Sequence, residues 1–251
     1  MAPDQRDSMT ETEASARPGA SAPFSEPRAR PSLPPMPDRI KALPLNRQGY
    51  PVPWFVAWIN GEPDFRVIGP GKIAEAHNKH LCWICGKPLA RNFAFVIGPM
   101  CAINRVSAEP PSHMDCAIFS AMACPFLTRP KAKRRDAGLP EDAEDPAGEM
   151  LTRNPGVALV WLTRSYKPFR AHQNQGDPAA NEGVLFQVGD PHHTLWFAEG
   201  RKATRAEVMA SIDSGFPLLH DIAKQEGDDA CEELYRMRAR AMFFVPESAA
   251  P

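Results

Sequence analysis

Two short motifs in this chain supply four side chains that could bind one metal ion. Cys82 and Cys85 form a Cys-x-x-Cys pair that is followed by Gly86, and His113 and Cys116 form a His-x-x-Cys pair downstream. Thiolates and imidazoles in two close pairs are the ligands that a tetrahedral structural zinc ion requires. The glycine lets the turn close, so that backbone N–H groups can point at the sulfurs. The sequence therefore predicts a zinc site made by Cys82, Cys85, His113 and Cys116.

The residues around the second pair predict the start of a helix. Ser112 is a suitable N-cap, which would place His113 and Cys116 on one face of the first helical turn. Between the two pairs, residues 89–100 are rich in aromatic and β-branched side chains and end near a Gly-Pro step. That composition predicts one or two short strands. The expected order is a cysteine turn, a β segment, a loop and a ligand-bearing helix.

Residues 80–126, with these four ligand residues, resemble a treble-clef zinc finger, in which a Cys-x-x-Cys turn and a helix N-terminus share one zinc ion. The resemblance implies a zinc cofactor. It does not select an activity, because treble clefs serve nucleic-acid binding, protein binding, nuclease and purely structural roles. The stretches 95–100, 109–113 and 124–127 (FVIGPM, EPPSH and CPFL) also look like a group of uncharacterised bacterial and phage proteins.

The Cys82 and Cys85 pair has a second interpretation as a redox dithiol. A thioredoxin-like motif needs a strand before the pair and a helix that begins at it. Here Gly86 and Pro88 follow the pair instead. The metal interpretation is therefore the favoured one.

Two further cysteines lie near the predicted ligands. Cys124 follows Cys116 by eight residues, which is about 12 Å along a helix, so the two cannot share one ion. Cys101 could replace His113 as the fourth ligand only if the end of the β segment folded back. Both Cys101 and Cys124 are expected to be small buried hydrophobic residues.

His77 and His80 lie three residues apart on a predicted short helix just before the cysteine turn. They could form a second metal site or provide a catalytic base. An exposed pair without a chemical role is the more common situation, and it is the expectation here.

Composition limits the classes of function. The chain has 251 residues and a formal net charge of −1, which gives no overall attraction to nucleic acids or acidic membranes. The N-terminus lacks the apolar core of a secretory signal, and the longest apolar stretches are too short to span a bilayer. A cytoplasmic protein is expected. In that reducing compartment, clustered cysteines favour metal binding over disulfides.

The fold class predicted from the sequence is α+β, with a treble-clef-like zinc module, β-hairpins and a small C-terminal sheet-and-helix unit. The expected divisions are a disordered Pro/Ala-rich tail over 1–40, a zinc module over 45–128, a charged linker over 129–152 and a small α+β unit over 153–246. The two folded units could pack as one globule, because neither has many strands alone.

Strands are predicted by apolar, β-branched and aromatic runs at 54–59, 65–68, 157–162, 184–188 and 194–198. The first two flank an Asn60-Gly61 turn and should form a hairpin. Residues 163–183 are expected to be a polar loop. Helices are predicted over 72–80, from a capping box at Thr204 and Glu207 to a stop at Gly215 and Pro217, and over 218–226 and 229–241.

These features favour a zinc-stabilised binding or accessory protein with a protein partner, and the sequence leaves its oligomeric state open. The zinc ion would be structural, and no catalytic motif accompanies it. The alternative is a nucleic-acid-binding protein that uses a basic segment next to the zinc helix, formed by Lys131, Lys133, Arg134 and Arg135. A metal-dependent hydrolase or nuclease is disfavoured, because the sequence supplies no carboxylate or histidine to face an open metal position.

Overall fold

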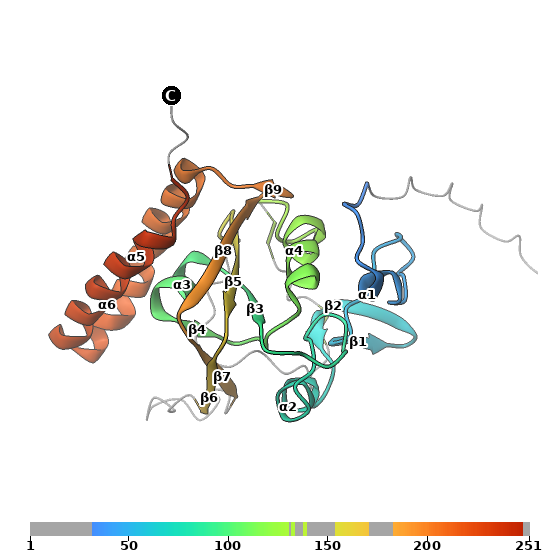
Figure 1. Ribbon diagram of the computed structural model, residues 1–251. Helices are drawn as coiled ribbons and strands as arrows, with labels where there is room; N and C mark the ends of the chain where they lie inside the picture. The colour runs from blue at the N-terminus through green and yellow to red at the C-terminus, as the bar shows by residue number, and fades with distance from the viewer. Residues whose placement is uncertain (1–31, 131, 134–137, 140–153, 171–182, 248–251) are drawn as a thin grey trace, which may run out of the picture.

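The computed structural model describes residues 32–130, 132–133, 138–139, 154–170 and 183–247. In these residues the central sheet is antiparallel, in the order β3 (Phe93–Ile97), β5 (Ala158–Thr163), β8 (Pro191–Ala198) and β9 (Arg201–Lys202). Helix α4 (Met114–Ala123) covers one face of the sheet (Figure 1). On the other face lie α3 (Pro99–Asn104) and the pair α5 (Arg205–Glu226) and α6 (Asp228–Ala241). The fold is α+β, as predicted.

Alternate side chains of β5 point to opposite faces of the sheet and pack against the helices there. The strand therefore lies at the centre of the core. Leu159 and Trp161 point into the core beneath α5 and α6. Val160 and Leu162 point the other way and pack against α4. Every residue of the strand is buried. A strand that is covered on both faces has a continuous apolar sequence, which is the pattern that predicted it.

Two smaller sheets lie beside the central one. One has the order β4 (Val106–Ser107), β7 (Val184–Val188) and β6 (Tyr166–Arg170), and the other is the hairpin of β1 (Val56–Ile59) and β2 (Glu62–Ile68). The turn of this hairpin has φ of 50° at Asn60 and 81° at Gly61. Positive φ at both positions is what an Asn-Gly hairpin turn requires.

Strand pairing crosses the boundary between the two expected units. Strand β3 pairs with β5, and β4 pairs with β7, so segments 45–128 and 153–246 contribute to the same sheets. The prediction of a polar loop over 163–183 was wrong at β6, which forms a full ladder with β7. Most side chains of β6 are exposed, and the strand therefore carried no apolar signal. Residues 171–182 of that loop lie outside the described residues.

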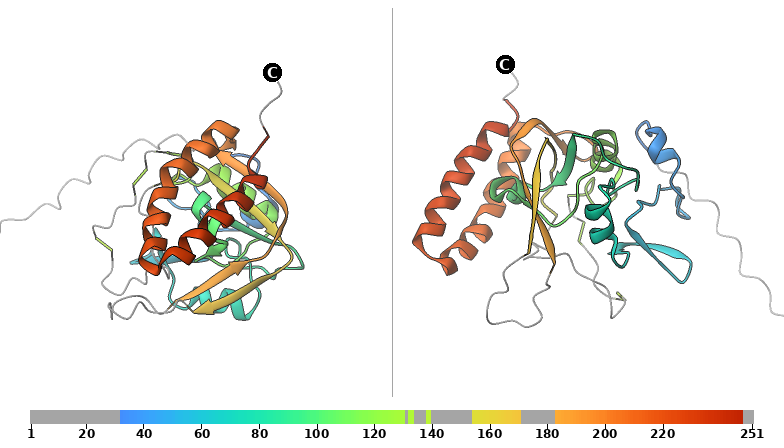
Figure 2. Two further views of the ribbon diagram at one scale, coloured as in Figure 1. Left: turned by 90° about the vertical axis from the view of Figure 1, so that its left-hand side faces the viewer. Right: turned by 60° about the horizontal axis from the view of Figure 1, so that its bottom comes forward.

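The prediction that Gly215 and Pro217 end the first C-terminal helix was wrong. The capping box of Thr204 and Glu207 is present, but α5 continues to Glu226 and ends before Gly227, which has φ of 117°. Pro217 lies on the exposed side of α5, while Phe216 beside it is buried in the core. Packing of that face outweighs the lost backbone hydrogen bond. Helices α5 and α6 lie antiparallel, side by side (Figure 2), and α6 leads into the short 3₁₀ helix η1 (Met242–Phe244).

No helix in the described residues is long and apolar enough to cross a membrane.

The prediction of a disordered tail over residues 1–40 was wrong at its C-terminal end, where a helix begins. Residues 1–31 lie outside the described residues, but the next residues lead into α1 (Asp38–Lys41) (Figure 1). Ile40 is only 1% exposed and packs in a small core with Cys82, Cys116 and Phe119. Leu33 and Met36 pack against the same core. The polar composition of residues 1–40 as a whole concealed these few apolar anchors.

We expect Ile40→Ala to lower the free energy of unfolding by about 2–5 kcal/mol, because it removes a fully buried side chain and leaves a cavity. Lys41→Ala, an exposed neighbour on the same helix, is the control and should have little effect. Denaturant unfolding of both variants provides the measurement. Equal stability of Ile40→Ala and the unaltered protein would show that α1 does not contribute to the core.

Candidate metal centre

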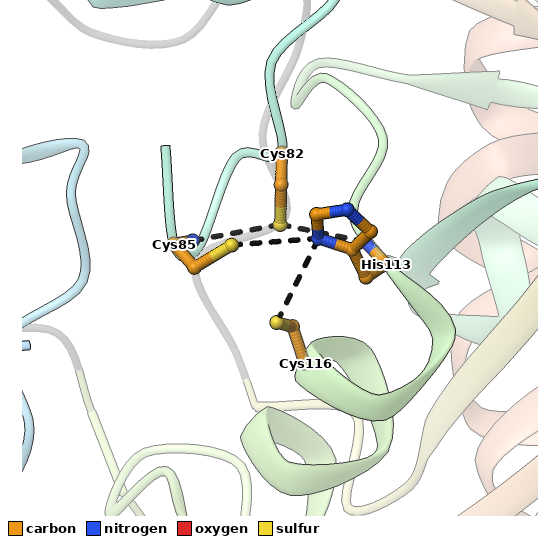
Figure 3. Close-up of side chains that lie close together, drawn as sticks. All are labelled: Cys82, Cys85, His113 and Cys116. Carbon is orange, nitrogen blue, oxygen red and sulfur yellow. Dashed lines mark hydrogen bonds between the residues drawn. The ribbon is translucent and has the colours of Figure 1, made fainter. Parts of the chain in front are cut away.

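The four predicted ligands lie together. The ligand atoms of Cys82, Cys85, His113 and Cys116 all lie within 4.8 Å of one another (Figure 3). The three cysteines are buried, and His113 is half-buried. In the part of the chain that the structure describes, this is the one group of three or more His, Cys, Asp or Glu side chains that could hold a metal ion.

The first cysteine pair is carried by a tight turn that closes on itself. Cys82 N–H donates to the Lys87 carbonyl, and Gly86 N–H donates to the Cys82 carbonyl, both at 2.8 Å. Leu81 and Pro88 form a β-bridge at the base of the turn. We call residues 81–88 the knuckle. These hydrogen bonds fix the spacing of the two sulfurs.

Gly86 is required in the knuckle for two reasons. Its φ is +67°, which side-chain-bearing residues adopt at a cost. A Cβ at this position would also lie 2.5 Å from the Trp54 ring. Trp54 is held against the knuckle by its backbone N–H, which donates to the Ile84 carbonyl at 2.8 Å. The Lys72 ammonium lies 3.8 Å from the centre of the Trp54 ring, on its face.

The second ligand pair lies at the start of α4. The expected N-cap was Ser112, but His113 itself occupies that position, and the helix begins at Met114. Ser112 instead exchanges backbone hydrogen bonds with Ala94 of β3, at 2.7 and 2.9 Å. Because Cys116 falls on the first turn, it faces the same space as His113, as predicted. The bridge to β3 anchors this end of α4 to the central sheet.

The Cys82 sulfur lies in a field that favours its negative charge. It accepts hydrogen bonds from the backbone N–H groups of His113 at 3.3 Å and of Cys85 at 3.5 Å. Interactions with the thiols of Cys116 and then Cys85 are the main reason why the pKa of Cys82 lies well below its ordinary value. The same interaction raises the pKa of Cys116. Because a cysteine ligand must be a thiolate, a bound cation would displace the thiol protons of this cluster.

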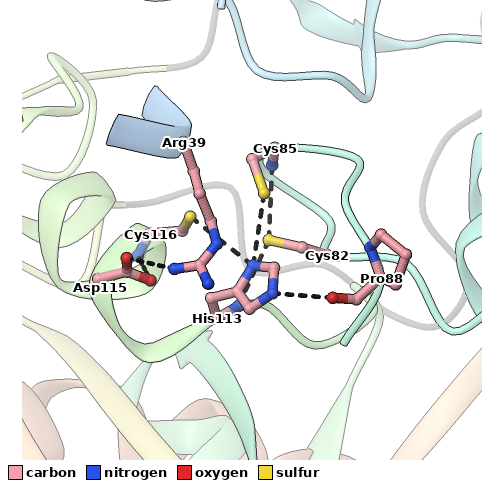
Figure 4. Close-up of polar contacts among 7 residues, drawn as sticks. All are labelled: Arg39, Cys82, Cys85, Pro88, His113, Asp115 and Cys116. Carbon is pink, nitrogen blue, oxygen red and sulfur yellow. Dashed lines mark hydrogen bonds and ion pairs between the residues drawn. The ribbon is translucent and has the colours of Figure 1, made fainter. Parts of the chain in front are cut away.

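His113 is oriented for metal binding through Nδ1. This atom lies 3.4 Å from the Cys85 sulfur and 4.0 Å from the Cys116 sulfur. On the other side of the ring, Nε2 is 3.0 Å from the Pro88 carbonyl oxygen (Figure 4). A carbonyl can only accept, so Nε2 carries a proton, and in the neutral ring Nδ1 then keeps the lone pair that a metal needs. A second partner of this kind is typical of metal-binding histidines.

A cation lies beside the sulfur cluster. The Arg39 guanidinium from α1 donates to the Asp115 carboxylate at 2.7 Å (Figure 4). Asp115 is the main reason why the pKa of Arg39 is raised, and the charges of Cys116 and Cys85 contribute in the same direction. Sequence reasoning did not identify Arg39, because it lies 43 residues before Cys82 in a stretch that was assigned to a disordered tail.

The remaining candidate residues do not join this centre. Cys101 and Cys124 are free thiols outside the cluster, and burial raises the pKa of both. The rings of His77 and His80 are 6.4 Å apart, edge to face. His77 packs against Tyr166, and its Nδ1 is buried without a hydrogen-bond partner in the described residues.

Of the four residues of the predicted basic segment, the described part of the chain includes one. Lys133 is exposed, and Lys131, Arg134 and Arg135 lie outside the described residues. The nucleic-acid alternative that depends on them stays a prediction from the sequence.

Glu109 is a half-buried acid close to the knuckle that the sequence did not single out. Burial raises the pKa of its carboxyl group to about 7, and the Trp83 indole lowers it by a smaller amount. Trp83 Nε1 itself is buried without a partner of hydrogen-bond geometry in the described residues. The Trp83 ring stacks on Phe55, with centroids 4.5 Å apart. Glu109 thus links the knuckle to the pH of the solution.

Comparisons of the chain with known protein families, with curated proteins and with solved structures found no match. What this centre can do follows from its own chemistry.

We expect Gly86→Ala to destabilise the protein by more than Gly71→Ala does. Gly71 has a similar φ of +71° but nothing within 4 Å of an added Cβ, so it reports backbone strain alone, about 1–2 kcal/mol. Gly86→Ala adds the collision with Trp54 and should also weaken metal retention. Unfolding curves and metal content of the two variants give the comparison, and equal effects would rule out a role for Trp54 contact.

Glu109→Gln should stabilise the protein relative to the unaltered chain as the pH rises. The folded pKa of about 7 exceeds the ordinary value of 4.5, so ionisation disfavours folding. The unaltered protein therefore loses stability between these two pH values, by up to about 3 kcal/mol, and the glutamine variant does not. Taking the difference between the two proteins removes the contribution of the cysteines, which titrate in both.

Glu207→Gln provides a control in which the change of stability with pH has the opposite sign. The Arg201 guanidinium holds the pKa of Glu207 down at about 2, so this carboxylate stabilises the folded state above its ordinary pKa of 4.5. The free energy of unfolding of the unaltered protein should rise relative to that of this variant as the pH rises from about 2 to 4.5. Denaturant unfolding across the pH range tests both, and a Glu109→Gln difference that does not change with pH would contradict the assignment.

Proposed function

We propose that Cys82, Cys85, His113 and Cys116 bind one zinc ion, and that this ion is structural. The observation that carries the proposal is the geometry of the cluster, with three sulfurs and one imidazole nitrogen all within 4.8 Å. Three thiolates and a histidine form a common tetrahedral zinc set. Because the protein supplies all four ligands, no position remains for a water molecule or a substrate.

The ion would connect two parts of the chain that otherwise meet through a small apolar core and a few hydrogen bonds. The knuckle and the first turn of α4 meet at the cluster, and the surrounding core is small. Metal binding would therefore contribute directly to the stability of this region. The order of knuckle, β3 and helix N-terminus around the ligands supports the treble-clef interpretation of residues 80–126.

On this basis we infer that the chain is a zinc-stabilised binding or accessory protein. A closed metal site argues against metal-dependent hydrolysis, which needs an open coordination position. Large apolar side chains are exposed on separate elements, among them Trp58 of β1, Tyr235 of α6 and Phe243 of η1. Aromatic residues are enriched in protein interfaces, and a protein partner that contacts one of these positions is part of the proposal.

The purified protein should contain about one zinc ion per chain. Cys116→Ser and Cys82→Ser should each lose the metal and unfold at lower denaturant concentration, because the ion contributes folding energy. Cys124→Ser is the matched control, since it removes a thiol of the same α4 region outside the cluster, and its metal content should not change. Elemental analysis and unfolding curves provide the measurements. Protein purified without chelator that carries no metal would refute the proposal.

A further inference from the structure

A second candidate site lies away from the sulfur cluster. A cleft of about 490 Å³ opens where the end of α3 faces β6, the end of β7 and helix α6. In Figure 1, α3 and α6 lie on the opposite side of β5 from α4. The volume falls within the range of about 300–1,000 Å³ that is typical of small-molecule sites. None of the four predicted zinc ligands lines this cleft.

Arg105 is a preorganised cation in the cleft. It follows α3 in the left-handed conformation, with φ of 60°, and its carbonyl accepts from Val188 N–H at 2.8 Å. Its guanidinium carbon lies 4.6 Å from the centre of the Trp161 ring, over its face. Cation–π stacking on a buried indole fixes the plane of the guanidinium. Both terminal nitrogens donate to Asp190 at 3.1 Å, but that side chain is 94% exposed and gives weak neutralisation.

Two further cations line the cleft with no ion-pair partner among the described residues. These are Lys167 of β6 and Arg240 of α6. The other acidic side chain of the cleft, Glu233, is paired with Arg236 at 3.2 Å. The lining thus carries three cations and two carboxylates, and because Glu233 is paired with a cation outside the cleft, the balance is positive even with Asp190 set against Arg105. The cleft is therefore suited to an anion.

The rest of the lining provides a hydrogen-bond donor and an apolar wall. The Asn104 side-chain oxygen accepts from Val106 N–H at 3.0 Å, which orients the amide and leaves its NH₂ group free to donate. Ile103, Val188 and Met237 supply apolar surface. An organic body can pack on these side chains while an anionic group meets the cations.

We propose that this cleft binds a phosphate monoester of about mononucleotide size. Arginine matches phosphate oxygens through its planar set of donors, and lysine adds a point charge. A doubly charged phosphate makes better use of three cations than a singly charged carboxylate does. The apolar wall gives an organic phosphate an advantage over the free inorganic ion.

Isothermal titration of the full-length protein with adenosine 5′-monophosphate, glucose 6-phosphate and inorganic phosphate tests this assignment. At least one organic phosphate should bind saturably and about tenfold more tightly than inorganic phosphate, because only it contacts the apolar wall. The preference between the two organic probes identifies whether the body is a nucleoside or a sugar. No saturable binding by any probe, or equal binding of inorganic phosphate, would overturn the proposal.

Charge reversals locate the site. Lys167→Glu and Arg240→Glu should each weaken binding of the organic phosphate about tenfold, because each removes one charge-assisted contact. Lys202→Glu on β9 is the control for overall charge and should not change the affinity, since Lys202 does not line the cleft. Melting curves and metal content establish that the variants fold. Binding that survives both cleft variants, or falls equally with Lys202→Glu, would exclude this cleft.

Discussion

The convergence of three cysteine sulfurs and one imidazole within 4.8 Å is the constraint on which this part of the structure depends. Thiolates this close repel one another unless protons or a cation lie between them. The neighbouring thiols and two backbone N–H groups lower the pKa of Cys82, and the same interaction between thiols raises the pKa of Cys116. A divalent ion would satisfy all four groups at once. Such an ion would hold the knuckle and the start of α4 together by coordination, in addition to the small apolar core around them.

Helix α4 transmits this constraint to the rest of the fold because it has two apolar faces. Cys116 and Phe119 pack in the small core around the cluster, together with Ile40 from α1. Ala117 and Ala121, on the other side of the helix, pack against the central sheet. Their small side chains allow close approach to β5. One helix thus joins the knuckle and α1 to the main core, and the Ser112–Ala94 bridge fixes its N-terminal end.

Features that depend on neighbours in the chain could be predicted from the sequence. The ligand pairs, the Asn60-Gly61 turn, the capping box at Thr204 and the buried strand β5 all have short-range signals. Features that depend on distant contacts could not. Packing holds α5 together through Pro217, pairing with β7 creates the exposed strand β6, and contact with Asp115 gives Arg39 its place at the metal centre. The buried position of Ile40 could not be predicted from average composition either, because a few apolar residues hardly change the mean polarity of a forty-residue segment.

The two candidate sites share one structural support although they do not share residues. Strand β3 is bridged to the segment next to His113 through Ala94, and it leads directly into α3, which ends at Arg105 in the cleft. The strand is also fixed along its length by pairing with β5. A structural metal ion on one side of the sheet can therefore help to hold the frame of a binding cleft on the other side without touching its ligand. In such an arrangement the metal would contribute rigidity, and Arg105, Lys167 and Arg240 would provide the specificity of the proposed cleft.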